Sequence, residues 1–193
     1  MEKWLTETTA SHLLMVDTDM ILPPYLIEAL LEADKDIVGG LCFTGNGPSL
    51  SNLAPTIRVI RPNEDGKPNI EVLWDYPRDT LVKCDATGAA CMLIKRKVAE
   101  DVWEARGKDH PLPWFAHGVH NGIEIGEDVA FCLTAGKLGY EIWVDTGLVI
   151  PHVKARFLTD VEYALSLSKA DHPYYDEREK VPAYKEILDG SSS

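Results

Sequence analysis

The chain has 193 residues, of which 45% are hydrophobic and 26% charged, a balance typical of one globular domain with its own core. Its formal net charge of -12 disfavours binding to nucleic acid or anionic lipid, because both repel an acidic surface. The sequence has no signal peptide and no apolar run of membrane-spanning length. We therefore expect a soluble, cytoplasmic protein with no transmembrane segment.

The first part of the chain predicts a helix within residues 1–10, followed by a strand–helix–strand unit. His12–Val16 is a short apolar run, typical of a buried strand in an α/β sheet. A helix is predicted from Pro23 to Ala33, because proline is tolerated in the first helical turn. Asp36–Phe43 has the composition of the next buried strand, so this order predicts a doubly wound α/β sheet.

The remaining predicted elements are short and alternate with turn-forming residues. Residues 44–54 and 107–122 are rich in such residues and are predicted as loops. Strands are predicted over Pro55–Ile60, Asn69–Trp74, Leu81–Cys84, Ala89–Ile94, Tyr140–Val144 and Leu148–Ile150. Helices are predicted over Lys95–Ala105 and Glu127–Leu138, with Gly139 ending the second, and two amphipathic patches lie within 156–190.

Four cysteines occur at positions 42, 84, 91 and 132, and no two have the short spacing of a zinc knuckle or a redox motif. Most of them lie within apolar runs, such as Gly-Leu-Cys-Phe and Ala-Ala-Cys-Met. We therefore predict reduced thiols packed in the core rather than a disulfide framework.

Asp17 and Asp19 directly follow the first predicted strand. In open α/β sheets, ligands bind beyond the carboxyl ends of strands, and alternation places both carboxylates on one side. Two carboxylates there are costly unless a cation or hydrogen bonds neutralise them, and Mg²⁺ or Mn²⁺ takes oxygen ligands. The alternative is that Asp19 caps the next helix while Asp17 lies in a turn.

Glu127 and Asp128 open an apolar helix near the end of the predicted sheet. One interpretation is a general base held at the edge of a pocket, and the alternative is that both acids only stabilise the helix dipole. His152 closely follows the last predicted strand. There it either serves as a neutral imidazole ligand for a metal such as Mn²⁺ or has a purely structural role.

Four stretches together resemble family 2 glycosyltransferases and their GT-A relatives, namely MVDTDM, CDATGAACMLIKRKV, PWF and EIGEDVAFCLTAGKLGYEIWVDTGLVIPHV. The resemblance runs from about His12 to Val153, and its last stretch is the most specific. It implies a GT-A-like, Rossmann-like three-layer sandwich with a mixed central sheet over residues 1–155, followed by a helical extension at 156–190. It also implies transfer of a sugar from a nucleotide-sugar donor to a carbohydrate or other hydroxyl acceptor, with inversion.

The resemblance implies roles for the chemically active residues. Asp17 and Asp19 match the Asp-x-Asp motif, which binds the donor diphosphate through Mn²⁺ or Mg²⁺, with Asp19 the more direct ligand. His152 matches the distal histidine that is often the other protein ligand to the metal. Asp128, or otherwise Glu127, matches the base that deprotonates the acceptor hydroxyl.

Two further matches concern the sugar and the acceptor. Thr87, Gly88 and Ala89 match a small-residue loop beside the donor sugar and the acceptor. Trp114 and Phe115 match an aromatic pair near the acceptor, where a ring stacks on a sugar face. Simple core packing is the alternative for this pair.

The sequence departs from the family at its beginning, where only 16 residues precede Asp17 and the nucleoside-binding half is expected to be absent. Three accounts fit this departure: a minimal enzyme, a chain completed by a partner such as a second copy, or a remnant that binds without chemistry. A phosphohydrolase is disfavoured, because no further Asp/His cluster supports a two-metal centre. We expect the segment 156–190 or a second subunit to cover the open sheet edge.

Overall fold

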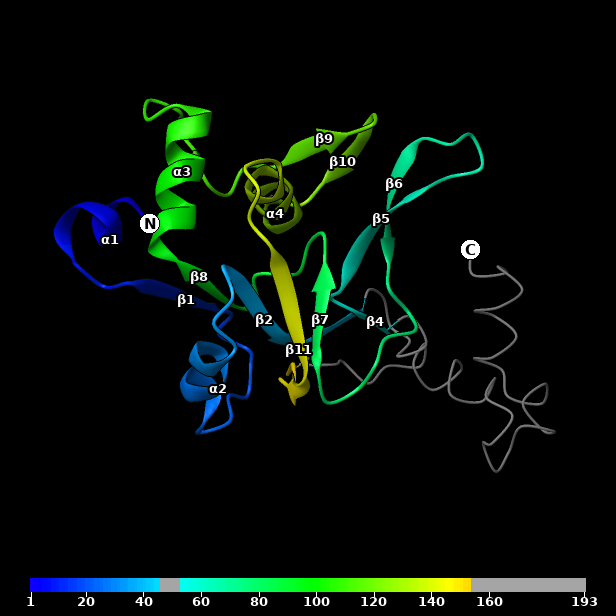
Figure 1. Ribbon diagram of the computed structural model, residues 1–193, viewed down its shortest axis with the longest axis horizontal. Coiled ribbons are helices and arrows are strands. Elements are labelled where there is room, and N and C mark those ends of the chain that lie inside the picture. The colour runs from blue at the N-terminus through cyan, green and yellow to red at the C-terminus, as the bar shows by residue number, and fades with distance from the viewer. Residues whose placement is uncertain (46–52, 154–193) are drawn as a thin grey trace, which may run out of the picture. The chain divides into compact units, whose positions relative to one another are not determined.

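The computed structural model describes residues 1–45 and 53–153, and one compact unit comprises Met1–Thr44 with Ala54–Val153. Its centre is a five-stranded sheet in the order β1-β8-β2-β11-β7 (Figure 1). These strands are β1 (His12–Val16), β8 (Cys91–Lys95), β2 (Ile37–Leu41), β11 (Ile142–Val149) and β7 (Leu81–Cys84). Only β2 and β11 run parallel within this sheet, so the predicted mixed α/β sheet is confirmed.

Helices cover both faces of this sheet (Figure 1). Side chains alternate along each strand, so both faces carry apolar side chains that pack against helices. The helices are α2 (Leu26–Glu32), α3 (Arg96–Arg106) and α4 (Glu127–Lys137). On β8, Met92 and Ile94 belong to the core cluster that includes side chains of α3 and α4. Cys91 and Leu93 belong to a second cluster with side chains of α2. The unit therefore has three layers, with helices on either side of the sheet.

Two glycines allow the central strands to pack closely. A Cβ atom at Gly40 would lie 2.6 Å from Cγ1 of the fully buried Ile150. A Cβ atom at Gly39 would lie 3.1 Å from the Cys91 carbonyl oxygen and 3.3 Å from Thr87 Cγ2. Because both positions face occupied space, the middle of β2 accommodates glycine but no larger residue without displacing its neighbours.

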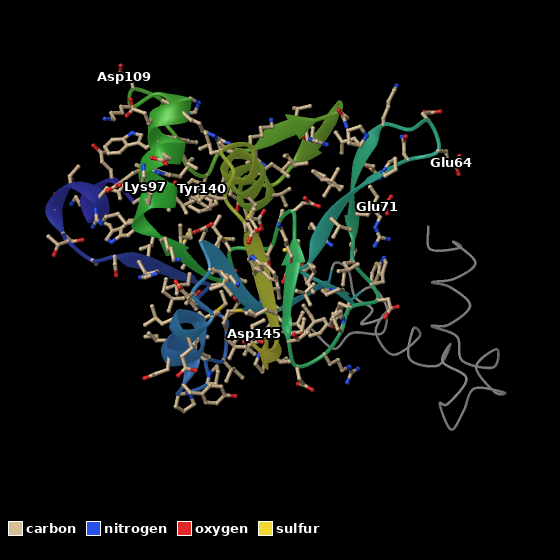
Figure 2. The ribbon with its side chains drawn as sticks, viewed as in Figure 1. Glu64, Glu71, Lys97, Asp109, Tyr140 and Asp145 are labelled. Carbon is tan, nitrogen blue, oxygen red and sulfur yellow. The ribbon has the colours of Figure 1, made fainter. Side chains whose placement is uncertain are left out.

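Three two-stranded ribbons accompany the main sheet. They are β3 (Phe43–Gly45) with β4 (Leu53–Pro55), β5 (Arg58–Pro62) with β6 (Pro68–Val72), and β9 (Gly118–His120) with β10 (Ile123–Ile125). In the β5–β6 turn, the Asn63 side-chain oxygen accepts hydrogen bonds from the backbone N–H groups of Asp65 and Lys67. Glu64 lies at the tip of this hairpin (Figure 2). The predicted turn between two strands is confirmed, although the first strand begins at Arg58 instead of Pro55 and the second ends at Val72 instead of Trp74.

The β9–β10 hairpin is a correction to the predicted loop over residues 107–122. Asn121 and Gly122 form its two-residue turn, and both have positive φ angles of 50° and 82°. An Asn-Gly pair in this conformation forms the type I′ turn that joins antiparallel strands. The strands on either side are only three residues long, so their alternation is too brief to stand out in the sequence.

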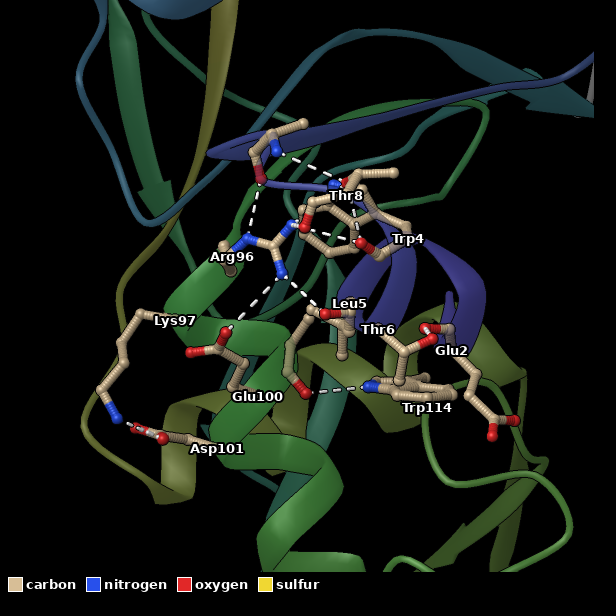
Figure 3. A network of polar contacts seen from close by, with 12 residues as sticks. Glu2, Trp4, Leu5, Thr6, Thr8, Arg96, Lys97, Glu100, Asp101 and Trp114 are labelled. Carbon is tan, nitrogen blue, oxygen red and sulfur yellow. Dashed lines mark hydrogen bonds and ion pairs between the residues drawn. The ribbon is translucent and has the colours of Figure 1, made fainter.

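Arg96 fixes the N-terminal helix α1 (Glu2–Glu7) to the start of α3 (Figure 3). Its guanidinium donates hydrogen bonds to the backbone carbonyl oxygens of Trp4, Leu5, Thr8 and Ala10. The same group lies 4.8 Å from the centre of the Trp4 ring, within the range of a cation–π interaction. Because so short a helix is unstable alone, these contacts hold it in place.

Two strand predictions require correction in the first half of the chain. His12–Val16 is half-buried at the sheet edge rather than fully buried, because β8 is its single partner strand among the described residues. Asp36–Phe43 divides at Cys42 into β2 and β3. The Cys42 carbonyl oxygen accepts a hydrogen bond from the Thr56 N–H, which draws the chain away from the main sheet.

The remaining bounds differ less. Tyr140–Val144 and Leu148–Ile150 form the single strand β11, whose register with β2 shifts between Asp145 and Val149. The helices predicted at 95–105 and 127–138 are confirmed to within one residue, whereas the helix predicted at 23–33 begins at Leu26. The two prolines thus precede that helix instead of forming its first turn.

The four cysteines are free and buried, which confirms the prediction of reduced core thiols. Burial raises the pKa of Cys42 and of Cys132 to about 12. No helix within residues 1–45 and 53–153 is both long and apolar enough to cross a bilayer. The predicted helical extension at 156–190, and with it the proposed cover of the sheet edge, lies outside the described residues.

Gly40→Ala is expected to destabilise the protein by about 1–3 kcal/mol, because the new Cβ must displace the buried Ile150 side chain. Gly136→Ala is the matched control, since a Cβ there meets only Ile142 Cδ1 at 3.8 Å. Replacing this helical glycine is expected to stabilise the protein by about 0.5–1 kcal/mol. Urea unfolding measures both changes, and a Gly40→Ala variant of unchanged stability would contradict the tight packing.

Candidate functional site

A cleft of about 310 Å³ lies where several strands and one helix begin or end. It is lined by Asp17, Cys42, Phe43, Thr44, Thr56, Arg58, Gly88, Ala89, Ala90, Glu127, Asp128, Val129 and His152. The structure thus brings together predicted site residues from four separate segments of the chain. A position beyond strand ends is where α/β sheets commonly bind ligands.

Asp17 enters the cleft because it continues the pairing of β1 with β8 by one residue. Its backbone N–H donates a hydrogen bond of 3.1 Å to the Ala90 carbonyl oxygen. Gly88 and Ala89, which precede Ala90, line the same cleft. A Cβ atom at Gly88 would lie 3.2 Å from Thr56 Cγ2, so glycine leaves this part of the cleft open.

Asp19 and His152 form a direct contact, with 2.9 Å between Asp19 Oδ2 and His152 Nε2. Backbone pairing holds the two residues together. Met20 and His152 form an antiparallel bridge, and the Val153 N–H donates to the Asp19 carbonyl oxygen at 2.8 Å. Asp19 is therefore connected to the cleft through His152, which lines it.

The hydrogen bonds of His152 assign its protonation. Nδ1 lies 3.1 Å from the Phe43 carbonyl oxygen, which can only accept a hydrogen bond, so Nδ1 carries a hydrogen. Nε2 faces Asp19 Oδ2, and two lone pairs at that separation repel each other unless a cation lies between them. The pair therefore suits either a proton on Nε2 or a metal ion in its place.

Asp128 and Glu127 begin α4 but differ in position. Asp128 is half-buried, and its Oδ1 accepts a hydrogen bond of 2.7 Å from the Val129 N–H. Its other oxygen, Oδ2, lies 3.6 Å from the position that a Cβ of Gly88 would occupy. Glu127 is more exposed and lies 3.6 Å from His117 Nε2. Asp128 therefore has one oxygen fixed by the backbone and the other beside Gly88 in the cleft.

Thr87 does not line the cleft, contrary to the predicted contact with a donor sugar. Its side chain is 0% exposed, and its Cγ2 lies against the backbone of Gly39. Its hydroxyl has no hydrogen-bond partner among the described residues. The space left by the missing side chain at Gly39 admits Thr87 into the core, which gives this residue a packing role.

Trp114 and Phe115, which the resemblance matched to an acceptor-binding pair, lie outside the cleft and line a separate groove. Trp114 is 7% exposed, and its Nε1 donates a hydrogen bond of 2.8 Å to the Ala99 carbonyl oxygen. Phe115 stacks on Phe131 with 4.9 Å between ring centres. The alternative of core packing therefore accounts for both aromatic residues.

Arg58 and Thr56 line the cleft but were not identified from the sequence. Burial lowers the pKa of Arg58, and the negative charge of Asp128 partly opposes this shift. No local pattern marks either residue, because Arg58 and Asp128 come from a strand and a helix far apart in the chain.

A metal ion in this region would depend partly on ligands from outside the protein. Within residues 1–45 and 53–153, no three His, Cys, Asp or Glu side chains gather closely enough to hold a metal ion. The contact between Asp19 and His152 supplies two ligand atoms. Mg²⁺ sites commonly complete their coordination with water and substrate phosphates, so a two-residue site is chemically reasonable.

No family model matches the sequence, and no curated protein matches it. Among solved structures, the chain is similar to A197 from STIV, with 16% sequence identity and a TM-score of 0.48. The alignment covers 80% of this chain and 63% of A197, so the chain spans less than two thirds of that protein. A likeness of this strength assigns neither a fold family nor a function to the chain.

Trp114→Phe is expected to lower stability by about 1–3 kcal/mol, because the buried Ala99 carbonyl oxygen loses its indole donor. Ligand binding in the cleft should be unchanged, since Trp114 does not line it. Trp74→Phe is the control, because Trp74 is 66% exposed. Chemical denaturation tests the first statement and ligand titration the second. Weakened ligand binding in a stably folded Trp114→Phe protein would support the predicted role of Trp114 in acceptor binding.

Proposed function

We propose that the chain is a metal-dependent glycosyltransferase of GT-A-like fold, which moves a sugar from a nucleotide-sugar donor to a hydroxyl acceptor with inversion. One observation carries this proposal. Asp19 and His152 are 133 residues apart in the sequence, yet they meet beside a cleft that also contains Asp17 and Asp128. Most of the residues matched to the family thus converge in space, whereas Thr87, Trp114 and Phe115 lie outside the cleft.

The chemistry of the Asp19–His152 pair fits a divalent metal ion. Two ligand atoms at neighbouring corners of an octahedral site with bonds of about 2.1 Å lie about 3.0 Å apart. The observed separation of 2.9 Å is compatible with this spacing, and it is also the length of an ordinary hydrogen bond. The bond from His152 Nδ1 to the Phe43 carbonyl oxygen orients the ring and leaves Nε2 as the ligand atom. When bound, Mn²⁺ or Mg²⁺ would neutralise charge on the departing nucleoside diphosphate.

Asp128 is the proposed general base for the acceptor hydroxyl. The backbone holds its Oδ1, while Oδ2 lies near Gly88 in the lining of the cleft. Glu127 is more exposed and lies 3.6 Å from His117 Nε2, which makes it the weaker candidate. A base placed in this way raises the nucleophilicity of a bound hydroxyl, typically by roughly 10²–10⁴-fold in rate.

A binding module without catalysis is the second candidate. The observation in its favour is that the described residues assemble two metal-ligand atoms but no group of three. The two candidates differ in one measurable respect, since only the enzyme turns over a nucleotide sugar.

Asp19→Ala and His152→Ala are each expected to weaken Mn²⁺-dependent binding of nucleoside diphosphates by roughly tenfold or more, because each removes one ligand to the ion. His117→Ala is the control, since this exposed histidine pairs only with Glu127 among the described residues. Isothermal titration calorimetry with and without Mn²⁺ measures the effect. Equal metal-dependent affinities in all variants would refute the proposed site, provided that their melting temperatures show intact folds.

Asp128→Asn is expected to lower turnover by roughly 10²–10⁴-fold while donor affinity stays near normal, because a base acts on the acceptor during the reaction. The amide keeps the shape of the carboxylate and removes its ability to accept a proton. Glu127→Gln is the matched comparison in the same helical turn. If Glu127→Gln loses turnover and Asp128→Asn keeps it, the base is Glu127. If no variant and no wild-type protein turns over any nucleotide sugar, the binding-module candidate is favoured.

A further inference from the structure

Arg58 stands at the junction of two cavities. It lines the cleft described above, and it also lines a second cavity of about 310 Å³. Val129 borders both cavities as well. The cleft and the second cavity therefore adjoin at these two residues, next to Asp128 at the start of α4.

The Arg58 side chain is half-buried, but the described residues accept few hydrogen bonds from it. Its one hydrogen bond among the described residues is a long one of 3.4 Å to the Pro55 carbonyl oxygen. No carboxylate in that part of the chain lies within ion-pair distance of it. A guanidinium has five N–H donors and stays charged, so most of its donors are left for solvent or a ligand.

The second cavity has the character of a small-molecule site. Its walls combine apolar side chains with a few polar groups, a composition typical of ligand pockets. The lining residues are Arg58, Asn69, Ile70, His120, Ile123, Glu124, Ile125, Gly126 and Val129. Among the described residues that line either cavity, Arg58 is the single lysine or arginine.

We propose that the second cavity binds the acceptor, and that the acceptor carries a carboxylate or phosphate group held by Arg58. This inference rests on the proposed glycosyl transfer and adds the chemical class of its acceptor. The other charged side chains that line the cleft are acidic. Arg58 is therefore the group there that would attract an anionic molecule. Guanidinium groups bind carboxylate and phosphate through paired hydrogen bonds, which would fix the orientation of the acceptor.

The position of Arg58 favours the acceptor over the donor as the source of this anion. Arg58 and Val129 line both cavities, and Asp128 precedes Val129 in the lining of the cleft, so the guanidinium lies at the same end of the cleft as the proposed base. An acceptor anchored at Arg58 and extending along Val129 would present a hydroxyl near Asp128. The donor diphosphate is expected at the Asp19–His152 pair instead.

The test compares Arg58→Gln and Arg58→Lys with the control Arg61→Gln, an exposed arginine on the same strand. The probes are glucuronic acid, glucose 6-phosphate and neutral glucose, with a nucleoside diphosphate plus Mn²⁺ as a separate arm. We expect the anionic probes to bind the wild type and Arg61→Gln more tightly than glucose does. In Arg58→Gln this preference should fall by roughly tenfold or more, and Arg58→Lys should keep part of it.

Binding of the nucleoside diphosphate with Mn²⁺ should be equal in wild type and Arg58→Gln. If Arg58→Gln weakens the nucleotide and leaves the anionic probes unaffected, Arg58 binds the donor and the acceptor assignment is overturned. If neither anionic probe binds better than glucose, it is likewise overturned while the metal–nucleotide result still supports the proposed function. Failure of the wild type to bind the nucleoside diphosphate with Mn²⁺ would contradict the proposed function, whatever the result with the anionic probes. Melting temperatures equal to that of Arg61→Gln exclude unfolding as the cause.

Discussion

The short antiparallel pairing between residues 19–21 and 151–153 is the constraint on which the candidate site depends. The Ile21 N–H donates to the Pro151 carbonyl oxygen at 2.9 Å, and the Val153 N–H donates to the Asp19 carbonyl oxygen at 2.8 Å. These two backbone bonds join the segment after the first strand to the segment after the last strand. These bonds bring Asp19 and His152 into contact, although the two residues are far apart in the sequence.

The main sheet gives this pairing a rigid base. Strand β11 lies beside β2 in the middle of the sheet, so the residues that follow it emerge at a fixed place. The close approach at Gly39 and Gly40 brings β2 against the neighbouring chain segments, and the buried Ile150 fills the space over Gly40. Sites built on packed strands vary less in geometry than sites built on loops. The cleft is therefore organised by the core, although its lining comes from strand ends and turns.

Electrostatics divides the cleft into two sides. Carboxylates of Asp17, Glu127 and Asp128 line it, in a chain whose formal net charge is -12. Such a site repels phosphates and carboxylates unless a cation is present. The Asp19–His152 pair offers two ligand atoms for a metal ion, and Arg58 places a guanidinium in the cleft that Asp128 also lines. Two separate positive centres would let one acidic cleft hold two anionic molecules.

Local sequence patterns predicted most of the helices and strands, although several bounds and the β9–β10 hairpin were wrong or missed. Periodicity and turn residues predicted helices α3 and α4 and most strands, because these patterns are local. The sequence also predicted that Asp17, Asp128 and His152 lie at the ends of elements, and the structure places them around one cleft. Gly88 and Ala89, which line the same cleft, were identified only through the family resemblance. The contact of Asp19 with His152 followed from the family resemblance, since no local pattern links positions so far apart.

Contacts between distant parts of the chain fix which side chains face the cleft. Thr87 is turned into the core because Gly39 leaves room for it, and Trp114 is turned toward the Ala99 carbonyl oxygen that satisfies its indole. Arg58 reaches the cleft because its strand passes close to the start of α4. In each case the deciding contact joins residues distant in the chain. The direction in which a side chain is buried depends on such neighbours, and sequence spacing alone does not specify them.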